Sequence, residues 1–228
     1  MLIHVVANDT DADTGLVGRR LAERHPGAAF RTLLREDVMA WPSERPDLLL
    51  LLGSAWSVHW PRLAREVGAE CDLIRRTHAE GVPILGICYG AQITARALGG
   101  DAIPATWPEI GWCPVEATPE TDAPVAGDWF QWHVDTFTLP PGARLLASNA
   151  AGPQAYRTGR TFATQFHPEV TTETVARWAH DAGDDTPARL GTSAERLVSD
   201  ARRHEVGNAA AAARLVDWFC DTVATAAG

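Results

Sequence analysis

One cysteine of this chain stands in a sequence pattern that suits nucleophilic catalysis. Cys88 lies between Gly86 and Gly90 in a G-x-C-x-G element, which follows an apolar run and precedes a helix-compatible segment. This pattern is typical of a nucleophile elbow, where the glycines allow a tight reversal and the nucleophile is strained at the carboxyl edge of a sheet. We therefore expect the Cys88 sulfur to be accessible. Taken alone, the element is equally compatible with a small buried residue in a strand-to-helix turn.

The expected position would also activate a cysteine. Unpaired backbone N–H groups and the helix dipole at a helix N-terminus favour the thiolate over the thiol. The other three cysteines, Cys71, Cys113 and Cys220, lie in amphipathic or strand-like segments, so we interpret them as small core residues. Because the four cysteines form no CxxC pair, the sequence predicts neither a zinc site nor a disulfide framework.

A second segment supplies a candidate base. Residues 164–169 read Thr-Gln-Phe-His-Pro-Glu at the end of a strand-like stretch. Residues two apart in an extended chain lie on the same side, so the side chains of His167 and Glu169 can lie next to each other. A cysteine nucleophile needs an imidazole within reach, and the imidazole works best when a carboxylate holds its other nitrogen. The pair alone is more typical of a structural histidine, but with Cys88 it predicts a Cys-His-Glu triad.

The elements that must bring these segments together have the pattern of an α/β sheet. Apolar, β-branched-rich runs are typical of buried parallel strands, and the segments between them have the apolar spacing of covering helices. The strand-like runs are residues 2–6, 48–52 and 83–87, and the clearest helical segments are 17–23 and 63–79. The first half of the chain therefore predicts a βαβαβα order.

The residue pattern changes after residue 99. Short segments punctuated by proline and glycine predict further strands, largely antiparallel, and helical signals return from residue 171. The predicted strands are 110–116, 130–139, 144–148, 154–157 and 161–166, and the predicted helices are 171–182, 193–205 and 208–227. The acidic loop 181–192 is the candidate linker. We predict a single domain over residues 1–228, with a helical C-terminal extension from about residue 183.

Composition disfavours several classes of partner. The net charge of -9 disfavours nucleic acid and anionic membranes, because affinity for phosphates depends mainly on basic side chains. All 20 basic residues are arginine, which leaves no lysine for Schiff-base chemistry. The longest apolar run, 48–52, is too short to span a bilayer, and the first residues show no basic leader or cleavage site. We therefore expect a cytoplasmic protein.

With both segments identified, the chain resembles the class I glutamine amidotransferases. Residues 86–92 (GICYGAQ) and 165–170 (QFHPEV) resemble the two signatures of that family in order and separation. The resemblance is strongest to glutaminase domains of the GMP synthetase type and their free-standing relatives, and it extends over nearly the whole chain. It implies a flavodoxin-like, open, mostly parallel twisted sheet flanked by helices, with extra antiparallel strands and a helical C-terminal end. It also implies hydrolysis of the glutamine side-chain amide through a γ-glutamyl thioester.

The resemblance places an oxyanion hole at the loop after the strand 48–52. This loop begins Gly53-Ser54-Ala55, where the family usually carries Gly-Gly-Pro. The negative charge of a tetrahedral intermediate needs backbone N–H donors, here those of Gly53 or Ser54 and of Tyr89. If the turn requires a positive φ at Ser54, the hole would be misshapen or formed only with ligand. The segment is also compatible with an ordinary connection.

Five further residues are implied as contacts of the substrate. The resemblance assigns Gln92 to the α-amino or carboxylate end of glutamine, although an exposed helical glutamine without a role fits equally. Trp132, His133 and Asp135 lie in a segment that resembles the family's contacts to the same end, and His133 is also an alternative base. We expect Trp56, in the loop of the presumed oxyanion hole, to cover the mouth of the site.

The implied reaction requires no metal and no organic cofactor. The chain carries no P-loop or ATP-pyrophosphatase motif, so an acceptor-activating synthetase, if one takes up the ammonia, would be a separate subunit. Two alternatives stay open. The same triad would serve a γ-glutamyl hydrolase or peptidase acting on a larger γ-glutamyl amide. A non-catalytic regulatory or binding subunit is the other alternative, because the turn 53–55 departs from the family pattern.

Overall fold

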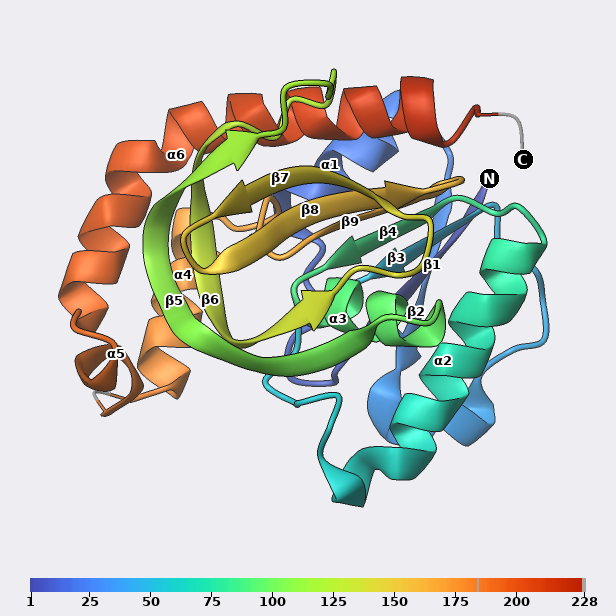
Figure 1. Cartoon of the computed structure of the whole chain (residues 1–228), viewed down its shortest axis with the longest axis horizontal. Coiled ribbons are helices and arrows are strands. Elements are labelled where there is room, and N and C mark those ends of the chain that lie inside the picture. The colour runs from blue at the N-terminus through green and yellow to red at the C-terminus, as the bar shows by residue number, and fades with distance from the viewer. Residues whose placement is uncertain (184, 227–228) are drawn as a thin grey trace.

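A mixed sheet forms the centre of the molecule (Figure 1). In this computed structural model, which describes residues 1–183 and 185–226, the sheet has nine strands in the order β2-β1-β3-β4-β9-β8-β7-β5-β6. Strands β2, β1, β3, β4 and β9 run parallel, and β8, β7, β5 and β6 continue the sheet antiparallel. The parallel strands are β1 (Leu2–Ala7), β2 (Ala29–Leu34), β3 (Leu48–Leu51), β4 (Ile84–Ile87) and β9 (Thr161–Thr164), and the antiparallel ones are β5 (Asp101–Ala117), β6 (Gly127–Thr138), β7 (Arg144–Asn149) and β8 (Gly152–Thr158).

Helices cover both faces of the parallel part, as the leucine run in β3 requires. Leu48 and Leu50 pack in a cluster with residues of α1 and α6, whereas Leu49 and Leu51 pack in a second cluster with residues of α2 and α3. Each of these four leucines is at most 1% exposed. A central parallel strand buried on both faces has this unbroken apolar composition. The helices are α1 (Gly15–Arg24), α2 (Ala64–Ala79), α3 (Tyr89–Ala97), α4 (Thr172–Asp181), α5 (Asp185–Arg189) and α6 (Ala194–Trp218).

The predicted fold class is confirmed, with corrections to individual elements. The sequence prediction missed β2, because this edge strand is largely exposed and lacks a continuous apolar pattern. Residues 161–166 were expected among the largely antiparallel strands, but β9 also pairs parallel with β4. The helices expected at 193–205 and 208–227 are one helix, α6, which continues through the exposed Gly207 and ends in a π-helical turn at Phe219–Val223.

The predicted linker at 181–192 contains the short helix α5. Residue 184 of this segment, and residues 227 and 228 of the predicted C-terminal extension, lie outside the described residues. Within the described chain, no helix combines the length and apolarity that a membrane crossing needs.

The close packing of α3 on β3 and β4 depends on two glycines. A Cβ atom at Gly90 would collide with the carbonyl oxygen of Leu51, and one at Gly86 would lie 2.8 Å from the carbonyl oxygen of Gly90. Real Cβ atoms do not approach oxygen this closely, so a side chain at either position would force the helix away from the strands. These glycines let the turn at Cys88 form against the sheet.

Replacing Gly90 by alanine tests this packing. We expect Gly90→Ala to lower the free energy of unfolding by about 1–3 kcal/mol, because the added methyl group overpacks the contact between α3 and β3. The control is Gly68→Ala, on the exposed side of α2 with no atom within 4 Å of the added Cβ. That change should raise stability by about 0.5–1 kcal/mol through helix propensity. Urea denaturation measures both, and wild-type stability in Gly90→Ala would contradict the packing.

Candidate active site

Cys88 occupies a strained turn between β4 and α3. It is the N-cap residue of α3, with φ 52° and ψ -109°, and it is the one non-glycine residue with positive φ in the described chain. Such a conformation costs about 1–3 kcal/mol and persists only where the surroundings impose it. Here the Cys88 N–H donates to the carbonyl of Thr164 at 2.7 Å, which ties the turn to the end of β9. The elbow conformation expected from the glycine pattern is therefore present.

The sulfur of Cys88 is buried, contrary to the expectation of an accessible thiol. The residue is only 4% exposed, because the loop after β9 and strand β6 cover the turn. The Gln165 side-chain amide donates to the sulfur at 3.6 Å, and the carbonyl oxygen of Trp132 lies 3.8 Å from it. A charged or polarised sulfur would be stabilised by the first of these contacts.

His167 and Glu169 share a side of the chain, as predicted from their spacing. Nδ1 of His167 lies 2.7 Å from Oε1 of Glu169, and both side chains are buried. Nε2 of His167 has no hydrogen-bond partner among the described residues, so this nitrogen is available for another group. The His167 N–H donates to the carbonyl of Phe130 at 2.9 Å, which fixes the histidine against β6.

Cys88 and His167 meet beside Gly53. A Cβ atom at Gly53 would lie 3.0 Å from Cε1 of His167 and 3.7 Å from Cβ of Cys88. One glycine therefore borders both side chains, and any larger residue would press on the imidazole. The structure therefore brings Cys88 close to His167 and Glu169, although Cys88 lies 79 residues before His167 in the chain.

The electrostatics of this site favour a charged imidazole. Burial lowers the pKa of His167, but the negative charges of Glu169 and Cys88 outweigh burial and raise the pKa well above its ordinary value. The raised pKa favours the protonated form of the His167 imidazole. Burial raises the pKa of the Cys71 and Cys220 thiols to about 11 and that of the Cys113 thiol to about 12.

Trp178 of α4 covers His167 and was not singled out from the sequence. Its ring packs edge-on against the imidazole with centroids 4.9 Å apart, and its indole N–H donates to Asp11 at 2.6 Å. The hydrogen bond anchors α4 to the loop between β1 and α1. No local pattern marks this tryptophan, since its partners lie far away in the chain.

The loop that follows β3 carries two of the N–H groups that the sequence predicts for an oxyanion hole, those of Gly53 and Ser54. The Ser54 hydroxyl donates to Oδ1 of Asn8 at 2.6 Å and accepts from the N–H of Trp56 at 3.0 Å. Ser54 does not have a positive φ, so replacing the usual glycine introduces no backbone strain. No acceptor among the described residues is paired with the N–H groups of Gly53, Ser54 or Tyr89.

Gln92 lies inside the site and not on an exposed helix surface. It is 3% exposed, and its amide donates to the carbonyl of Asp135 at 3.0 Å and to Oε1 of Gln165 at 3.2 Å. Asp135 is also buried, and its carboxylate accepts a hydrogen bond from the Ser57 hydroxyl. These contacts connect α3, β6 and the loop after β9 around the sulfur.

His133 is engaged through both ring nitrogens and is not free to act as a base. Nδ1 lies 2.9 Å from the carbonyl oxygen of Asp135, and Nε2 lies 3.1 Å from Oε2 of Glu109. Trp132, its neighbour, contributes the carbonyl oxygen near the sulfur. Trp56 is partly buried against the cluster that contains Tyr89, and its expected place over the mouth of the site stays a prediction.

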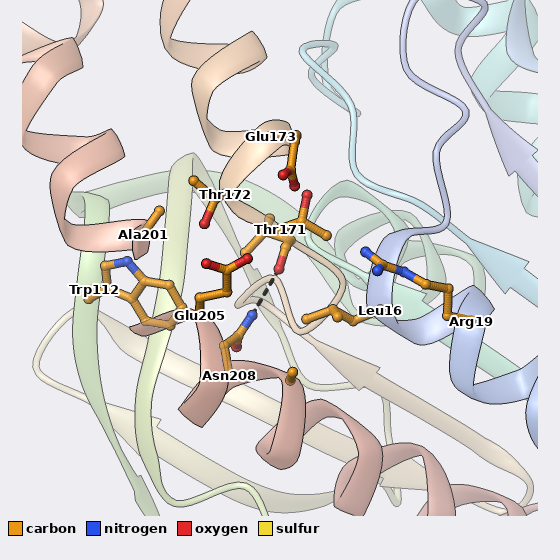
Figure 2. A pocket seen from close by; sticks show the side chains of 11 residues that line it. Leu16, Arg19, Trp112, Thr171, Thr172, Glu173, Ala201, Glu205 and Asn208 are labelled. Carbon is orange, nitrogen blue, oxygen red and sulfur yellow. Dashed lines mark hydrogen bonds between the residues drawn. The ribbon is translucent and has the colours of Figure 1, made fainter. Parts of the chain in front are cut away.

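A cavity of about 220 Å³ lies beyond the segment that follows Glu169 (Figure 2). Figure 2 shows side chains of α1, β5, α4 and α6 around it, including Arg19, Trp112 and Glu205. Asn208 of α6 donates to the carbonyl of Val170 at 2.9 Å, the dashed line in the figure. The cavity lining contains neither Cys88 nor His167, so we assign the site to the turn at Cys88.

Comparison with known proteins identifies the family. The family model described as "Glutamine amidotransferase class-I" matches residues 31–177. The chain belongs to the class I glutamine amidotransferase family. The matched region of this class I amidotransferase holds Cys88, His167, Glu169 and the loop at Gly53.

The amidotransferase is similar to part of longer synthases. It is 34% identical over 156 residues to the GMP synthase [glutamine-hydrolyzing] of Aeropyrum pernix, covering 63% of this chain and 30% of that protein. It is 33% identical over 180 residues to the corresponding enzyme of Thiobacillus denitrificans, covering 69% and 32%. The chain thus spans about a third of the length of the curated relatives it matches.

Solved structures agree with the fold. A glutamine amidotransferase from Thermotoga maritima superposes with a TM-score of 0.84 at 25% identity, covering 97% of this chain and 99% of that one. A glutamine amidotransferase from Methylobacillus flagellatus has a TM-score of 0.85 at 21% identity, covering 100% and 96%. The second similarity supports the fold of the amidotransferase alone.

The charge of Glu169 should control the pKa of His167. We expect Glu169→Gln to lower the pKa of His167, because the glutamine keeps the shape of the side chain but removes its negative charge. In the wild type the raised pKa contributes stability that is present below about pH 6.5 and is lost as the pH rises through the folded-state pKa. NMR titration of the His167 Cε1 proton measures the change.

The matched control is Glu173→Gln, which neutralises an exposed carboxylate of α4. The pKa of His167 should stay at its wild-type value in that variant. Equal values in the wild type and Glu169→Gln would contradict the electrostatic coupling.

Proposed function

We propose that this class I amidotransferase hydrolyses the side-chain amide of glutamine, with Cys88 as nucleophile, His167 as acid and base, and Glu169 as the carboxylate that orients the imidazole. The observation that carries the proposal is the strained turn that holds Cys88 beside His167, whose Nδ1 lies 2.7 Å from Glu169. Family membership supports a glutamine amide as the substrate.

The first half of the reaction forms a thioester. The Cys88 thiolate attacks the carboxamide carbon of glutamine, and the N–H groups of Gly53 or Ser54 and of Tyr89 stabilise the negative oxygen of the tetrahedral intermediate. The imidazolium of His167 donates its Nε2 proton to the amide nitrogen. The C–N bond breaks, ammonia leaves, and a γ-glutamyl thioester on Cys88 remains.

The second half restores the enzyme. Nε2 of His167, now neutral, takes a proton from a water molecule that attacks the thioester carbon. The C–S bond breaks, glutamate leaves, and the sulfur and the imidazole return to the charged pair. Glu169 holds the Nδ1 proton throughout, so the ring keeps one orientation in both halves.

We place the amino-acid end of glutamine near Gln92 and Asp135. The buried Asp135 carboxylate can accept charge-assisted hydrogen bonds from an α-ammonium group, which are stronger than hydrogen bonds between neutral groups. Trp132 and His133 provide the backbone of β6 beside it, with His133 fixed by Glu109. Trp56 is proposed as a cover over this end.

We propose that an acceptor-activating synthetase takes up the ammonia. The curated relatives are GMP synthases about three times as long as the matched region, which supports a synthetase as the user of the ammonia. A cytoplasmic location, the absence of nucleic-acid and membrane partners, and a reaction without metal or organic cofactor stay predictions. Glutamine and larger γ-glutamyl amides, assayed with and without candidate synthetases, distinguish a glutaminase from a γ-glutamyl hydrolase.

Removal of the Cys88 sulfur tests the proposed nucleophile. We expect Cys88→Ala to reduce glutamate release from glutamine at least about 1,000-fold, because no thioester can form without the nucleophile. Cys71→Ala is the matched control, since Cys71 is equally buried but lies in α2, and it should keep the wild-type rate within about twofold. Turnover in Cys88→Ala close to that of the wild type would refute the assignment.

A further inference from the structure

A fully buried ion pair lies behind the loop of the proposed oxyanion hole. Arg35 and Glu70 are each 1% exposed, and Nε of Arg35 lies 3.0 Å from Oε2 of Glu70. Arg35 follows β2 directly, at the start of the 3₁₀ helix Arg35–Ala40, and Glu70 lies in α2. Neither residue belongs to the triad or to the proposed glutamine contacts.

The guanidinium of Arg35 holds the backbone on which the oxyanion loop is built. Nη2 donates to the carbonyl of Leu52 at 2.8 Å, and Nη1 donates to the carbonyl of Gly53 at 3.1 Å. Each of these carbonyls shares a peptide plane with the N–H of the following residue, that of Gly53 or that of Ser54. Fixing the two carbonyl oxygens therefore fixes the direction of both candidate N–H donors, because the peptide bond is planar.

The guanidinium of Arg35 also contacts Tyr89, on the other side of the proposed oxyanion hole. Its central carbon lies 4.6 Å from the centroid of the Tyr89 ring, in a cation–π contact. The Tyr89 backbone N–H is the second proposed donor to the oxyanion. Arg35 thus contacts the two segments, loop 52–54 and the start of α3, whose relative position sets the distance between the donors.

Asn8 extends this network to the residue that departs from the family pattern. Its Oδ1 accepts from Nη1 of Arg35 at 3.1 Å and from the hydroxyl of Ser54 at 2.6 Å. The Asn8 amide in turn donates to Glu36 at 2.7 Å. Ser54 is therefore held by a side-chain hydrogen bond at the position where the family usually has a glycine.

We propose that Arg35, paired with Glu70, is a positioning residue that orients the oxyanion-hole N–H groups of Gly53, Ser54 and Tyr89. This inference rests on the proposed function of the site. A buried ion pair is a poor way to gain stability, since apolar residues of similar size commonly stabilise as well or better. An apolar pair at these positions could not make the hydrogen bonds that Arg35 donates to the carbonyls of Leu52 and Gly53.

The test compares arginine-to-lysine changes at two places. Arg35→Lys keeps the positive charge beside Glu70 but lacks the planar fork that reaches both carbonyls. The control is Arg160→Lys, because Nη1 of Arg160 donates to the carbonyl of Gly81 at 2.7 Å, ahead of β4 and at the opposite end of that strand from Cys88. For each variant we would measure kcat and KM for glutamine, thermal unfolding, and alkylation of Cys88 by iodoacetamide.

We expect Arg35→Lys to lower kcat about 10- to 100-fold with KM within about threefold, because oxyanion donors act mainly in the transition state. Alkylation by iodoacetamide forms no oxyanion, so its rate should stay within about threefold of the wild type. Arg160→Lys should leave all three kinetic values near those of the wild type. Wild-type kcat in folded Arg35→Lys, or an equal loss of kcat and alkylation, would overturn the inference.

A second variant keeps the test decisive if Arg35→Lys does not fold. The double change Arg35→Met with Glu70→Met replaces both charges by flexible apolar side chains and leaves no unpaired charge. If it folds with wild-type kcat, the inference is wrong, and if it folds with the selective loss of kcat, the inference is supported. A wild-type protein without Cys88-dependent glutamine turnover would instead refute the proposed function and, with it, the role of Arg35.

Discussion

The close approach of α3 to β3 and β4 is the constraint on which the site depends. Gly86 and Gly90 permit it, and the hydrogen bond from the Cys88 N–H to Thr164 completes it. Together they impose a positive φ on Cys88 that a loosely held cysteine would not keep. Because β3, β4 and β9 are neighbouring parallel strands, the loop after β3, the turn after β4 and the segment after β9 meet at one edge of the sheet.

Burial strengthens the electrostatic interactions of His167 with its neighbours at this edge of the sheet. His167, Glu169 and Cys88 are all buried, and a low effective dielectric strengthens the attraction between opposite charges. The same burial would penalise each charge if it stood alone. This reasoning also applies to Arg35 and Glu70, a second buried pair behind the first. The site thus consists of buried polar side chains that contact one another at the edge of an otherwise apolar sheet.

Local patterns predicted the parts of the structure that local forces determine. The buried strand and the turn at Cys88 are each specified by a few neighbouring residues, so the sequence predicts both. These residues are the leucines at 48–52 and the glycines around Cys88. Edge strand β2, the cover of Trp178 over His167 and the Arg35–Glu70 pair depend on segments that meet only in the fold. The burial of the Cys88 sulfur was missed for the same reason, since β6 and the loop after β9 cover it. That residues 1–228 form one domain stays a prediction.

The central claim is that Cys88 is the reactive cysteine among the four. It lies beside the imidazole of His167, in a site proposed to bind glutamine. Peptide mapping after treatment with a glutamine analogue that carries an electrophilic carbon in place of the carboxamide tests this most directly. The account predicts modification at Cys88 and at no other cysteine, suppression by added glutamine, and slow modification in His167→Asn. Modification at Cys71, Cys113 or Cys220, or modification at Cys88 that glutamine and the His167 change leave unaltered, would contradict it.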